Sequence, residues 1–339
     1  MAKTVKLADL AERLNVSTVT VSKALSNQKG VSEELREKIK ELADEMGYVQ
    51  PSTMRKLKQR ENFYIGVVIS ERYIDKYGSF YWQIYQAITM HAGKKSSFTI
   101  MEVMSQEDEQ NLVLPKMVLE KKIDGIIVVG RMEDAYLKAL KADEAIPVMY
   151  LDFYDRGYEF DAVISNSYYG SYLLTNYLFS MGHEKIAYVG TLLATESITD
   201  RYFGYAKSMM EHGVKIEPEW IIEDRRMDSG KLHGFVDWEL PKNCPTAFVC
   251  NCDLTASEMI KKLRGMGYSV PEDFSVVGFD NYLYPGLCDI GITTYEVDTS
   301  LMAKRAVNNL IKKMSDANYK TGVTIIEGRL VYKDSVKAR

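Results

Sequence analysis

Short apolar runs alternate with helical stretches from residue 63 onward, and this alternation limits the possible folds more than any other feature. Eight runs are strand candidates: FYIGVVIS (63–70), FTIMEVM (98–104), DGIIVVG (124–130), IPVMYLDF (146–153), DAVISN (161–166), KIAYVG (185–190), TAFVCNC (246–252) and FSVVGFD (274–280). Strands that alternate with helices form parallel, doubly wound sheets. A last strand is expected in GVTIIEGRLVYKDS (322–335). Strands spread over about 270 residues fit two such sheets better than one.

The composition argues against several classes of protein. No apolar stretch approaches the roughly 18 residues of a membrane span, and the N-terminus MAKTVKLADL lacks the apolar segment of a secretory signal. The histidines are scattered, and the cysteines include no C-x-x-C pair: Cys244, Cys250, Cys252 and Cys288. We therefore expect a cytoplasmic protein with reduced thiols, no membrane association, no metal and no cofactor.

Helical spacing and capping residues predict an all-α unit in residues 1–49. Residues 6–14 carry apolar side chains on one helical face, and Asn15 tolerates the left-handed conformation of a tight turn. Ser17 is a suitable N-cap for a second helix over 18–26. A third helix follows in GVSEELREKIKELADEMGY. Two short helices joined by a tight turn, then a third, form a helix-turn-helix unit.

Composition and charge set the remaining domain boundaries. The segment QPSTMRKLKQRE (50–61) is polar and basic, which predicts a linker or a marginal helix, and residues 62–339 form the α/β part. Residues 1–60 carry 12 Lys and Arg against 8 Asp and Glu, whereas the rest carries 31 against 39. A basic N-terminal part on an acidic body indicates that only the N-terminal part meets a polyanion.

The second predicted helix has a small polar outer face if Val21 packs inward. The residues on or beside this face are Ser17, Thr18, Val19, Thr20, Ser22 and Lys23. A small face fits the major groove of DNA, where hydroxyls suit phosphate oxygens, Lys23 can reach a guanine and Val19 a thymine methyl. An ordinary three-helix packing unit with a hydroxyl-rich face explains the same pattern, so both interpretations stay open at this point.

The segment LADLAERLNVSTVTVSKALSNQKGVSEELREKIKELADEMGYVQ resembles the N-terminal domain of the LacI/GalR family of bacterial transcriptional repressors. The shared patterns are D-x-A-x-x-x-x-V-S-x-x-T-V-S-x-x-L and V-S-x-x-x-R-x-K-I. The resemblance continues nearly to the C-terminus through MGHEKIAYVG, DRYFGYAKSMMEHG, TAFVCNCDLTA, GYSVPEDFSVVGFDN and ITTYEVD. It implies a DNA-binding transcriptional regulator, by family default a repressor of carbohydrate-utilisation genes.

The resemblance also assigns roles in DNA binding. It places Thr18, Val19 and Lys23 at base-reading positions, with Lys23 standing where arginine is commoner. Lys6 stands where a residue that caps the first helix is usual. The family binds DNA as a homodimer, which implies a near-palindromic operator.

The segment after residue 49 matches the family's hinge helix. There the resemblance places Leu57 as a wedge that enters the minor groove at the operator centre. Pro51, Met54 and Lys58 depart from the hinge pattern, so a flexible linker is the alternative. A helix this short orders only on DNA and against its dimer mate.

The remainder resembles the family's effector domain, whose fold is that of periplasmic sugar-binding proteins. Two doubly wound lobes are joined by crossing strands, and a small molecule binds between them. The matching effector-contacting positions are Phe80, Tyr81, Trp82, Asp152, Arg201, Cys252 and Asp280. Carboxylates and an arginine hydrogen-bond vicinal hydroxyls, and an aromatic face packs on a sugar ring. A small saccharide is therefore the expected effector, with a purine or nucleoside as the alternative; Phe80 and Tyr81 also fit a plain core role.

Some effector positions depart from the family pattern. Cys252 replaces the usual asparagine, and Ser229 falls near the usual aromatic residue of the cross-cleft loop. Other tyrosines could supply stacking surface instead: Tyr73, Tyr77, Tyr154 and Tyr158.

Two other function classes were considered. An enzyme would need a nucleophile and a base, for which Cys252 with His183, His212 or His233 is the best set, but no nucleophile elbow or Walker loop surrounds them. A sugar-binding protein without DNA function would lack residues 1–60. We therefore predict no catalysis, and allosteric control of operator affinity by a coupling of about 1–3 kcal/mol.

Overall fold

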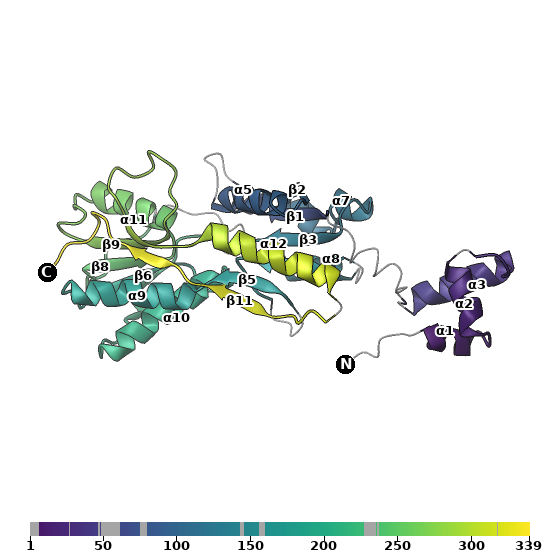
Figure 1. The fold of residues 1–339 in the computed structure, drawn as a ribbon. Coiled ribbons are helices and arrows are strands. Elements are labelled where there is room, and N and C mark those ends of the chain that lie inside the picture. The colour runs from purple at the N-terminus through teal and green to yellow at the C-terminus, as the bar shows by residue number, and fades with distance from the viewer. Residues whose placement is uncertain are drawn as a thin grey trace. The chain divides into compact units, whose positions relative to one another are not determined.

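The computed structural model describes residues 7–26, 28–46, 48, 62–74, 80–142, 146–155, 160–226, 235, 237–316 and 318–339. The chain divides into two compact units, Met1–Arg60 and Glu61–Arg339, each with its own hydrophobic core (Figure 1). Among the helices of the described residues, none combines the length and apolar character that a bilayer span requires.

The smaller unit contains α1 (Leu7–Arg13), α2 (Thr18–Leu25) and α3 (Glu33–Glu45). Its fully buried side chains come from all three helices: Leu10, Val21, Ala24 and Ile39. Asn15 has a φ of 51°, so the turn between α1 and α2 uses the left-handed conformation. The Ser17 side chain accepts a hydrogen bond from the Thr20 backbone N–H (3.0 Å) and caps α2. The predicted helix-turn-helix unit is confirmed.

Replacing Asn15 by alanine is expected to destabilise this unit by about 1 kcal/mol, because an alanine pays a steric penalty in the left-handed region that asparagine largely avoids. Replacement by glycine tests the cause, since glycine adopts positive φ freely and is expected to retain the stability. Amide hydrogen exchange of α1 and α2 in the intact protein measures both changes. Equal protection in all three proteins would contradict the argument.

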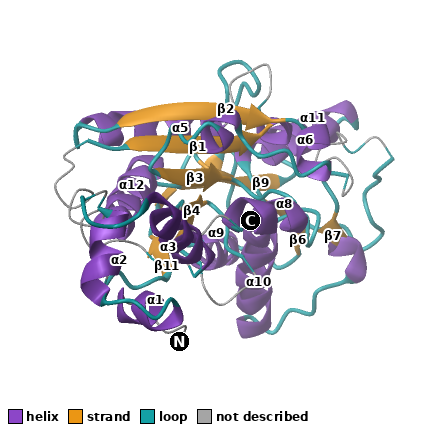
Figure 2. Ribbon diagram, turned by 90° about the vertical axis from the view of Figure 1, so that its right-hand side faces the viewer, coloured by secondary structure: helices purple, strands orange, loops and turns teal. Residues whose placement is uncertain are grey.

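The larger unit contains two six-stranded sheets, each at the centre of a lobe. The first-lobe sheet has the order β11-β5-β4-β3-β1-β2: β1 (Tyr64–Ser70), β2 (Phe98–Met104), β3 (Gly125–Val129), β4 (Val148–Leu151), β5 (Ala162–Ser165) and β11 (Val323–Ile326) (Figure 2). The second-lobe sheet has the order β12-β10-β9-β8-β6-β7: β6 (Ile186–Val189), β7 (Ile221–Ile222), β8 (Ala247–Cys250), β9 (Ser275–Asp280), β10 (Thr293–Glu296) and β12 (Arg329–Val331).

Neighbouring strands pair in parallel, except that β12 runs antiparallel to β10. The two predicted doubly wound sheets are therefore confirmed. All eight strand candidates form strands, and the last strand expected in GVTIIEGRLVYKDS is present as two strands, β11 and β12. The structure adds β7 and β10, which were not predicted.

Helices cover the sheets. The first lobe contains α5 (Phe80–Gly93), α6 (Gln106–Gln110), α7 (Lys116–Leu119), α8 (Asp134–Lys141) and α12 (Thr299–Ser315), and the second contains α9 (Ser167–Ser180), α10 (Glu196–Glu211) and α11 (Asp253–Gly265). Short 3-10 turns span Glu71–Tyr73 (η1) and Pro218–Trp220 (η2).

Consecutive residues of the central strands pack into different cores. In β1, Val67 packs with α5 and α12, whereas Val68 packs with α7 and α8. In β4, Met149 packs into the same core as Val67, and Tyr150 packs into the same core as Val68. Because both faces of the sheet are buried, the strands read as continuous apolar runs, as parallel sheets require.

The chain crosses between the lobes after β5, after β10 and after β11. The Asn166 amide in the first crossing donates to the Glu327 carboxylate in the last (Nδ2 to Oε1, 2.8 Å). Because all strands except β12 are parallel within their sheets, the carboxyl ends of both sheets lie at these crossings. This is the edge at which α/β proteins bind ligands.

Candidate functional site

The outer face of α2 is the first candidate site, and it lies on the smaller unit. Val21 and Ala24 are fully buried, while Thr18, Ser22 and Lys23 are exposed. Val19 is 60% exposed, although it is apolar. This small, exposed outer face fits a helix that enters the major groove of DNA.

The hydroxyl groups at the start of α2 cap the helix. Ser17 accepts from the backbone N–H of Thr20, and the two side-chain oxygens lie 2.9 Å apart. A hydroxyl both accepts and donates, so this cap leaves a proton for a phosphate oxygen at the helix N-terminus. Lys6 and the hinge residues Pro51, Met54, Leu57 and Lys58 lie outside the described residues, so their roles stay predictions.

The first-lobe side of the second candidate site, the inter-lobe site, is built around Asp152 at the end of β4. The Tyr81 hydroxyl on α5 donates to Asp152 (OH to Oδ2, 2.9 Å). The Tyr81 ring contacts Phe80 and Tyr73, with centroids 5.6 and 4.8 Å away. Asp152 is 8% exposed, and burial raises its pKa to about 6, an effect that the nearby charge of Arg201 opposes.

The second-lobe side is built around Arg201 on α10. Its guanidinium donates to Asp280 at the end of β9 (Nη2 to Oδ1, 3.1 Å), to Ser167 (Nε to Oγ, 3.3 Å) and to the Asn251 carbonyl. It also stacks on Phe279, with 3.8 Å between the guanidinium carbon and the ring centroid. Burial raises the pKa of Asp280, although Arg201 opposes this effect.

Both acidic residues of the site have unusual backbone conformations. Asp152 has a φ of 69° and Asp280 a φ of 96°, a region that residues other than glycine adopt uncommonly, although aspartate and asparagine tolerate it better than most. A conformation of this kind persists where side-chain position matters more than stability. It supports a functional reading of both carboxylates.

Contacts between the lobes surround this set of residues. The Tyr154 hydroxyl of the first lobe donates to Asp200 on α10 (3.1 Å), and Arg131 at the end of β3 pairs with Glu196 at the start of α10. The Phe80 ring meets Tyr282 of the second lobe with centroids 6.1 Å apart. The structure therefore brings Phe80, Tyr81, Asp152, Arg201 and Asp280 to one place.

The other predicted effector residues are placed differently. Trp82 is 40% exposed, with its ring packed against Tyr85 on α5. Cys252 is the N-cap of α11, where its sulfur accepts from the Thr255 N–H (3.4 Å). Tyr77, Tyr158 and Ser229 lie outside the described residues.

Three further residues lie at this edge and were not predicted from the sequence: Asp224, Arg225 and Tyr282. Tyr282 follows Asp280 in the loop after β9 and donates its backbone N–H to Asp253 (2.9 Å). Asp224 and Arg225 follow the unpredicted strand β7. In the sequence, the charged segment EDRR follows the apolar pair of β7. Unless this pair is recognised as a strand, EDRR is interpreted as a solvent-exposed loop.

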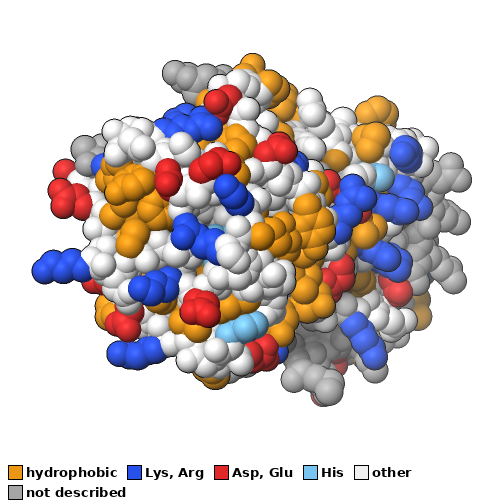
Figure 3. Space-filling view, turned by 90° about the vertical axis from the view of Figure 1, so that its left-hand side faces the viewer, with side chains coloured by type: hydrophobic (Ala, Val, Ile, Leu, Met, Phe, Trp, Pro, Cys, Tyr) orange, Lys and Arg blue, Asp and Glu red, His pale blue; other side chains and the backbone are white. Residues whose placement is uncertain are grey.

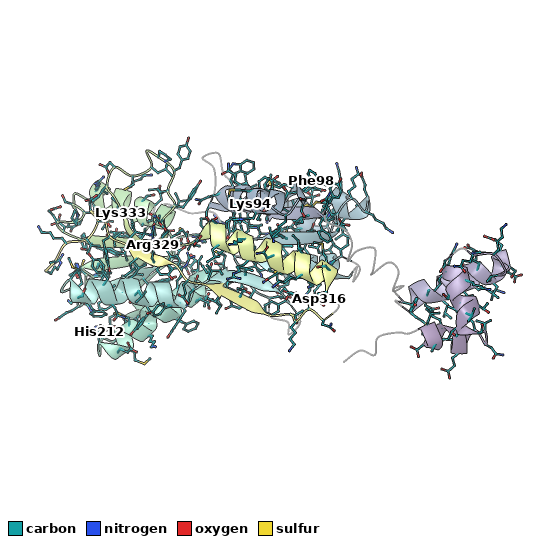
Figure 4. All side chains as sticks on the ribbon, viewed as in Figure 1. Lys94, Phe98, His212, Asp316, Arg329 and Lys333 are labelled. Carbon is teal, nitrogen blue, oxygen red and sulfur yellow. The ribbon has the colours of Figure 1, made fainter. Side chains whose placement is uncertain are left out.

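Two of the histidines have structural roles. His183 contacts Thr246 Oγ1 (Nδ1, 2.9 Å) and the Lys337 carbonyl (Nε2, 3.1 Å), which fixes the C-terminal segment on the second lobe. His212 stacks on Phe179 with centroids 3.8 Å apart, just beyond the end of α10 (Figure 4). His233 lies outside the described residues. Among the described residues, no group of His, Cys, Asp and Glu side chains could hold a metal ion.

The surface of the second lobe has a mixed charge. Figure 3 shows basic and acidic side chains interspersed over the face it presents, between separate groups of hydrophobic side chains. A mixed surface does not indicate nucleic-acid binding, in contrast to the basic N-terminal residues.

Comparisons with known proteins identify a known domain in each of the two units. Residues 6–51 match the family described as bacterial regulatory proteins, lacI family, and residues 175–336 match the periplasmic binding protein-like domain. The HTH-type transcriptional repressor PurR of Pasteurella multocida is 27% identical over 346 residues, covering 98% of this chain and 99% of the relative. The ribose operon repressor of Haemophilus influenzae is 25% identical over 339 residues, covering 97% and 98%.

Solved structures show the same fold. The transcriptional regulator CelR–cellobiose complex has a TM-score of 0.70 at 19% identity and covers 98% of this chain and 99% of its own. The lac repressor dimer bound to operator and the anti-inducer ONPF has a TM-score of 0.67 at 22% identity and covers 99% and 100%. The relatives are transcriptional regulators, which confirms the expectation that the chain is not an enzyme. The helix-turn-helix unit therefore contains a LacI-family DNA-binding domain and the two parallel-sheet lobes contain a periplasmic binding protein-like domain, the architecture of the DNA-binding transcriptional repressors that the chain resembles over nearly its whole length.

Proposed function

We propose that the operator affinity of this repressor is controlled by a small saccharide bound at the inter-lobe site. One observation carries the proposal: Asp152, Arg201 and Asp280 converge at the carboxyl ends of the two sheets beside the rings of Phe80 and Tyr81. Carboxylate acceptors next to guanidinium donors match the vicinal hydroxyls of a sugar, and the rings match its apolar face.

Relatives support a saccharide but leave a second candidate. One similar structure is a complex with cellobiose, and one relative is a ribose operon repressor. Several relatives are named PurR, which favours a purine. The rings of Phe80 and Tyr282, which meet edge-on across the lobes, also offer aromatic surface on which a planar base could pack.

The mechanism that we propose is linkage between effector binding and the arrangement of the lobes. A ligand held by Asp152 from the first lobe and by Arg201 and Asp280 from the second favours one arrangement of the lobes. The chain acts as a homodimer on a near-palindromic operator, so a change in this arrangement alters how two helix-turn-helix units fit their half-sites. A coupling of about 1–3 kcal/mol changes operator affinity roughly 5- to 150-fold.

The test begins with the DNA. Full-length protein selects its operator from a library of random duplexes, and its affinity for that duplex is then measured with and without each candidate effector. The candidates are D-ribose, D-galactose, D-glucose and cellobiose, with hypoxanthine and guanine as the purine arm. We expect at least one sugar to shift the operator affinity. A shift with a purine and with none of the sugars would transfer the proposal to the second candidate.

Lys23→Gln is expected to weaken binding to the selected operator by about 1–3 kcal/mol, because the exposed lysine of α2 contacts a base edge. Lys38→Gln is the matched control: it removes an exposed lysine of α3 that pairs with Glu34, and it should leave the affinity nearly unchanged. Titration of the selected duplex at one fixed salt concentration measures both. Similar losses in the two variants would mean that charge alone, and not position on α2, determines binding.

A further inference from the structure

An ion pair between Asp224 and Arg225 lies at the carboxyl ends of β6, β7 and β8. The Asp224 side chain is 0% exposed. Its carboxylate accepts from the Thr191 N–H (2.9 Å), the Thr255 hydroxyl (2.7 Å) and the Asn251 amide (2.7 Å). Although burial favours the neutral acid, Arg225 and these donors hold the pKa of Asp224 below its usual range. The carboxylate is therefore a fixed negative charge inside the lobe.

This carboxylate holds Arg225 in one position. Arg225 donates from Nη2 (2.7 Å) and from Nε (3.1 Å) to Asp224, and from Nη2 to the Asn251 side-chain oxygen (3.0 Å). Its backbone N–H and carbonyl are both bonded to the Thr191 hydroxyl, at 3.0 and 2.9 Å. The Cys252 side chain lies near the guanidinium as well. Among the described residues, Nη1 has no oxygen acceptor, while the side chain is 17% exposed.

Arg225 belongs to the same site as Arg201. Asn251 lies between them, since its carbonyl accepts from Arg201 and its side-chain oxygen accepts from Arg225. The charge of Arg225 also acts on Asp280, the carboxylate that pairs with Arg201. Two guanidinium groups therefore face the second-lobe side of the inter-lobe site, where the sequence analysis expected one.

The stability of the fold is only a weak explanation for this buried ion pair. Burying an ion pair costs about as much in lost hydration as the pair returns, so an apolar pair of the same size serves the fold equally well. In Arg225 the backbone and two of the three guanidinium nitrogens are fixed, whereas the third nitrogen is left over. A side chain held in this way is preorganised to bind a ligand.

We propose that Arg225 is an effector-binding residue that donates from Nη1 to an oxygen acceptor of the effector and so selects among saccharides. The inference rests on the proposed effector site between the lobes. The acceptor is a hydroxyl oxygen in a neutral sugar or a carboxylate oxygen in an acidic sugar. Only one donor nitrogen is left over, so the contact is a single point and not the paired fork that arginine makes with a carboxylate.

The test measures saccharide binding by calorimetry to full-length wild-type protein and Arg225→Gln. The probes are D-galactose, D-glucose, D-ribose and cellobiose, together with D-galacturonate and D-glucuronate. A hydrogen bond from a charged donor is worth about 10- to 100-fold in affinity, and this loss is expected for each sugar that binds the wild type. A loss confined to the uronates identifies the acceptor as a carboxylate, and an equal loss for neutral sugars identifies it as a hydroxyl.

Two further variants make the result decisive. Arg226→Gln removes the adjacent arginine, which lies along an open surface pocket with Glu219 and Trp238, and it should bind sugar like the wild type. Asp224→Asn/Arg225→Gln removes both charges together, so it avoids an unpaired buried carboxylate and should fold with the same weakened sugar binding. If the wild type binds none of the saccharides, the proposed function fails. If it binds one and both Arg225 variants bind it equally well, only this inference fails.

Discussion

Arg201→Met is expected to abolish the response to the effector and to lower the free energy of unfolding of the larger unit by about 3–5 kcal/mol. Arg201 is 5% exposed, and it is the ion-pair partner of Asp280. Methionine fills similar space but leaves that carboxylate without its counter-charge and the Asn251 carbonyl without this donor. Because both interactions belong to one buried network, their loss should lower the stability of the fold and impair the effector site together.

Denaturant unfolding followed by tryptophan fluorescence measures the stability change. Arg329→Met is the matched control, since Arg329 also pairs with a carboxylate, on Glu296, but its side chain is 74% exposed. An exposed pair contributes about 0–1 kcal/mol, so the control should unfold like the wild type. Comparable unfolding of both variants would show that Asp280 does not depend on Arg201.

Asp152→Asn is expected to stabilise the sugar-free protein at pH 8 and to weaken sugar binding about 10- to 100-fold. Burial raises the pKa of Asp152 to about 6, so the folded protein binds this proton more tightly than the unfolded chain does. In the wild type, the contribution of Asp152 to the free energy of unfolding is fully present below about pH 4 and is lost as the pH rises through 6. Asparagine carries no charge at any pH, and it tolerates the φ of 69°.

Denaturant unfolding of both proteins between pH 4 and pH 8 measures the effect. The stability difference should be near zero at pH 4 and grow to about 1–3 kcal/mol at pH 8. Sugar binding to the wild type should also weaken below pH 6, since a protonated Asp152 accepts fewer hydrogen bonds. A stability difference that stays constant with pH would contradict the assignment of this pKa to Asp152.

The central strands were predictable because burial on both faces makes each of them a continuous apolar run. The strands that were missed lack this signal. β7 spans only two residues, and β10 begins with two polar residues, Thr293 and Thr294, so neither is a continuous apolar run. Such segments become strands because an existing sheet offers a free edge, and this is a tertiary effect.

Local features of the smaller unit were also predictable. The Ser17 cap and the turn at Asn15 involve neighbours within a few residues, so sequence alone identifies them.

The inter-lobe site required more than local sequence. Asp152, Arg201 and Asp280 were assigned through the family resemblance, and only the fold shows how distant strand ends bring them together. Asp224 and Arg225 had no such guide. Adjacent opposite charges read as a solvated surface, and it is Thr191 and Asn251, from the ends of β6 and β8, that enclose them.

The crossings between the lobes have a consequence for protein synthesis. The first-lobe sheet ends with β11, and α12 packs on its central strands, so this lobe contains segments from near both ends of the larger unit. A nascent chain on the ribosome therefore cannot finish its first lobe until translation is almost complete, whereas the helix-turn-helix unit can fold as soon as it emerges. During that interval the exposed β5 edge and the apolar surface meant for α12 are open to chaperones and to aggregation.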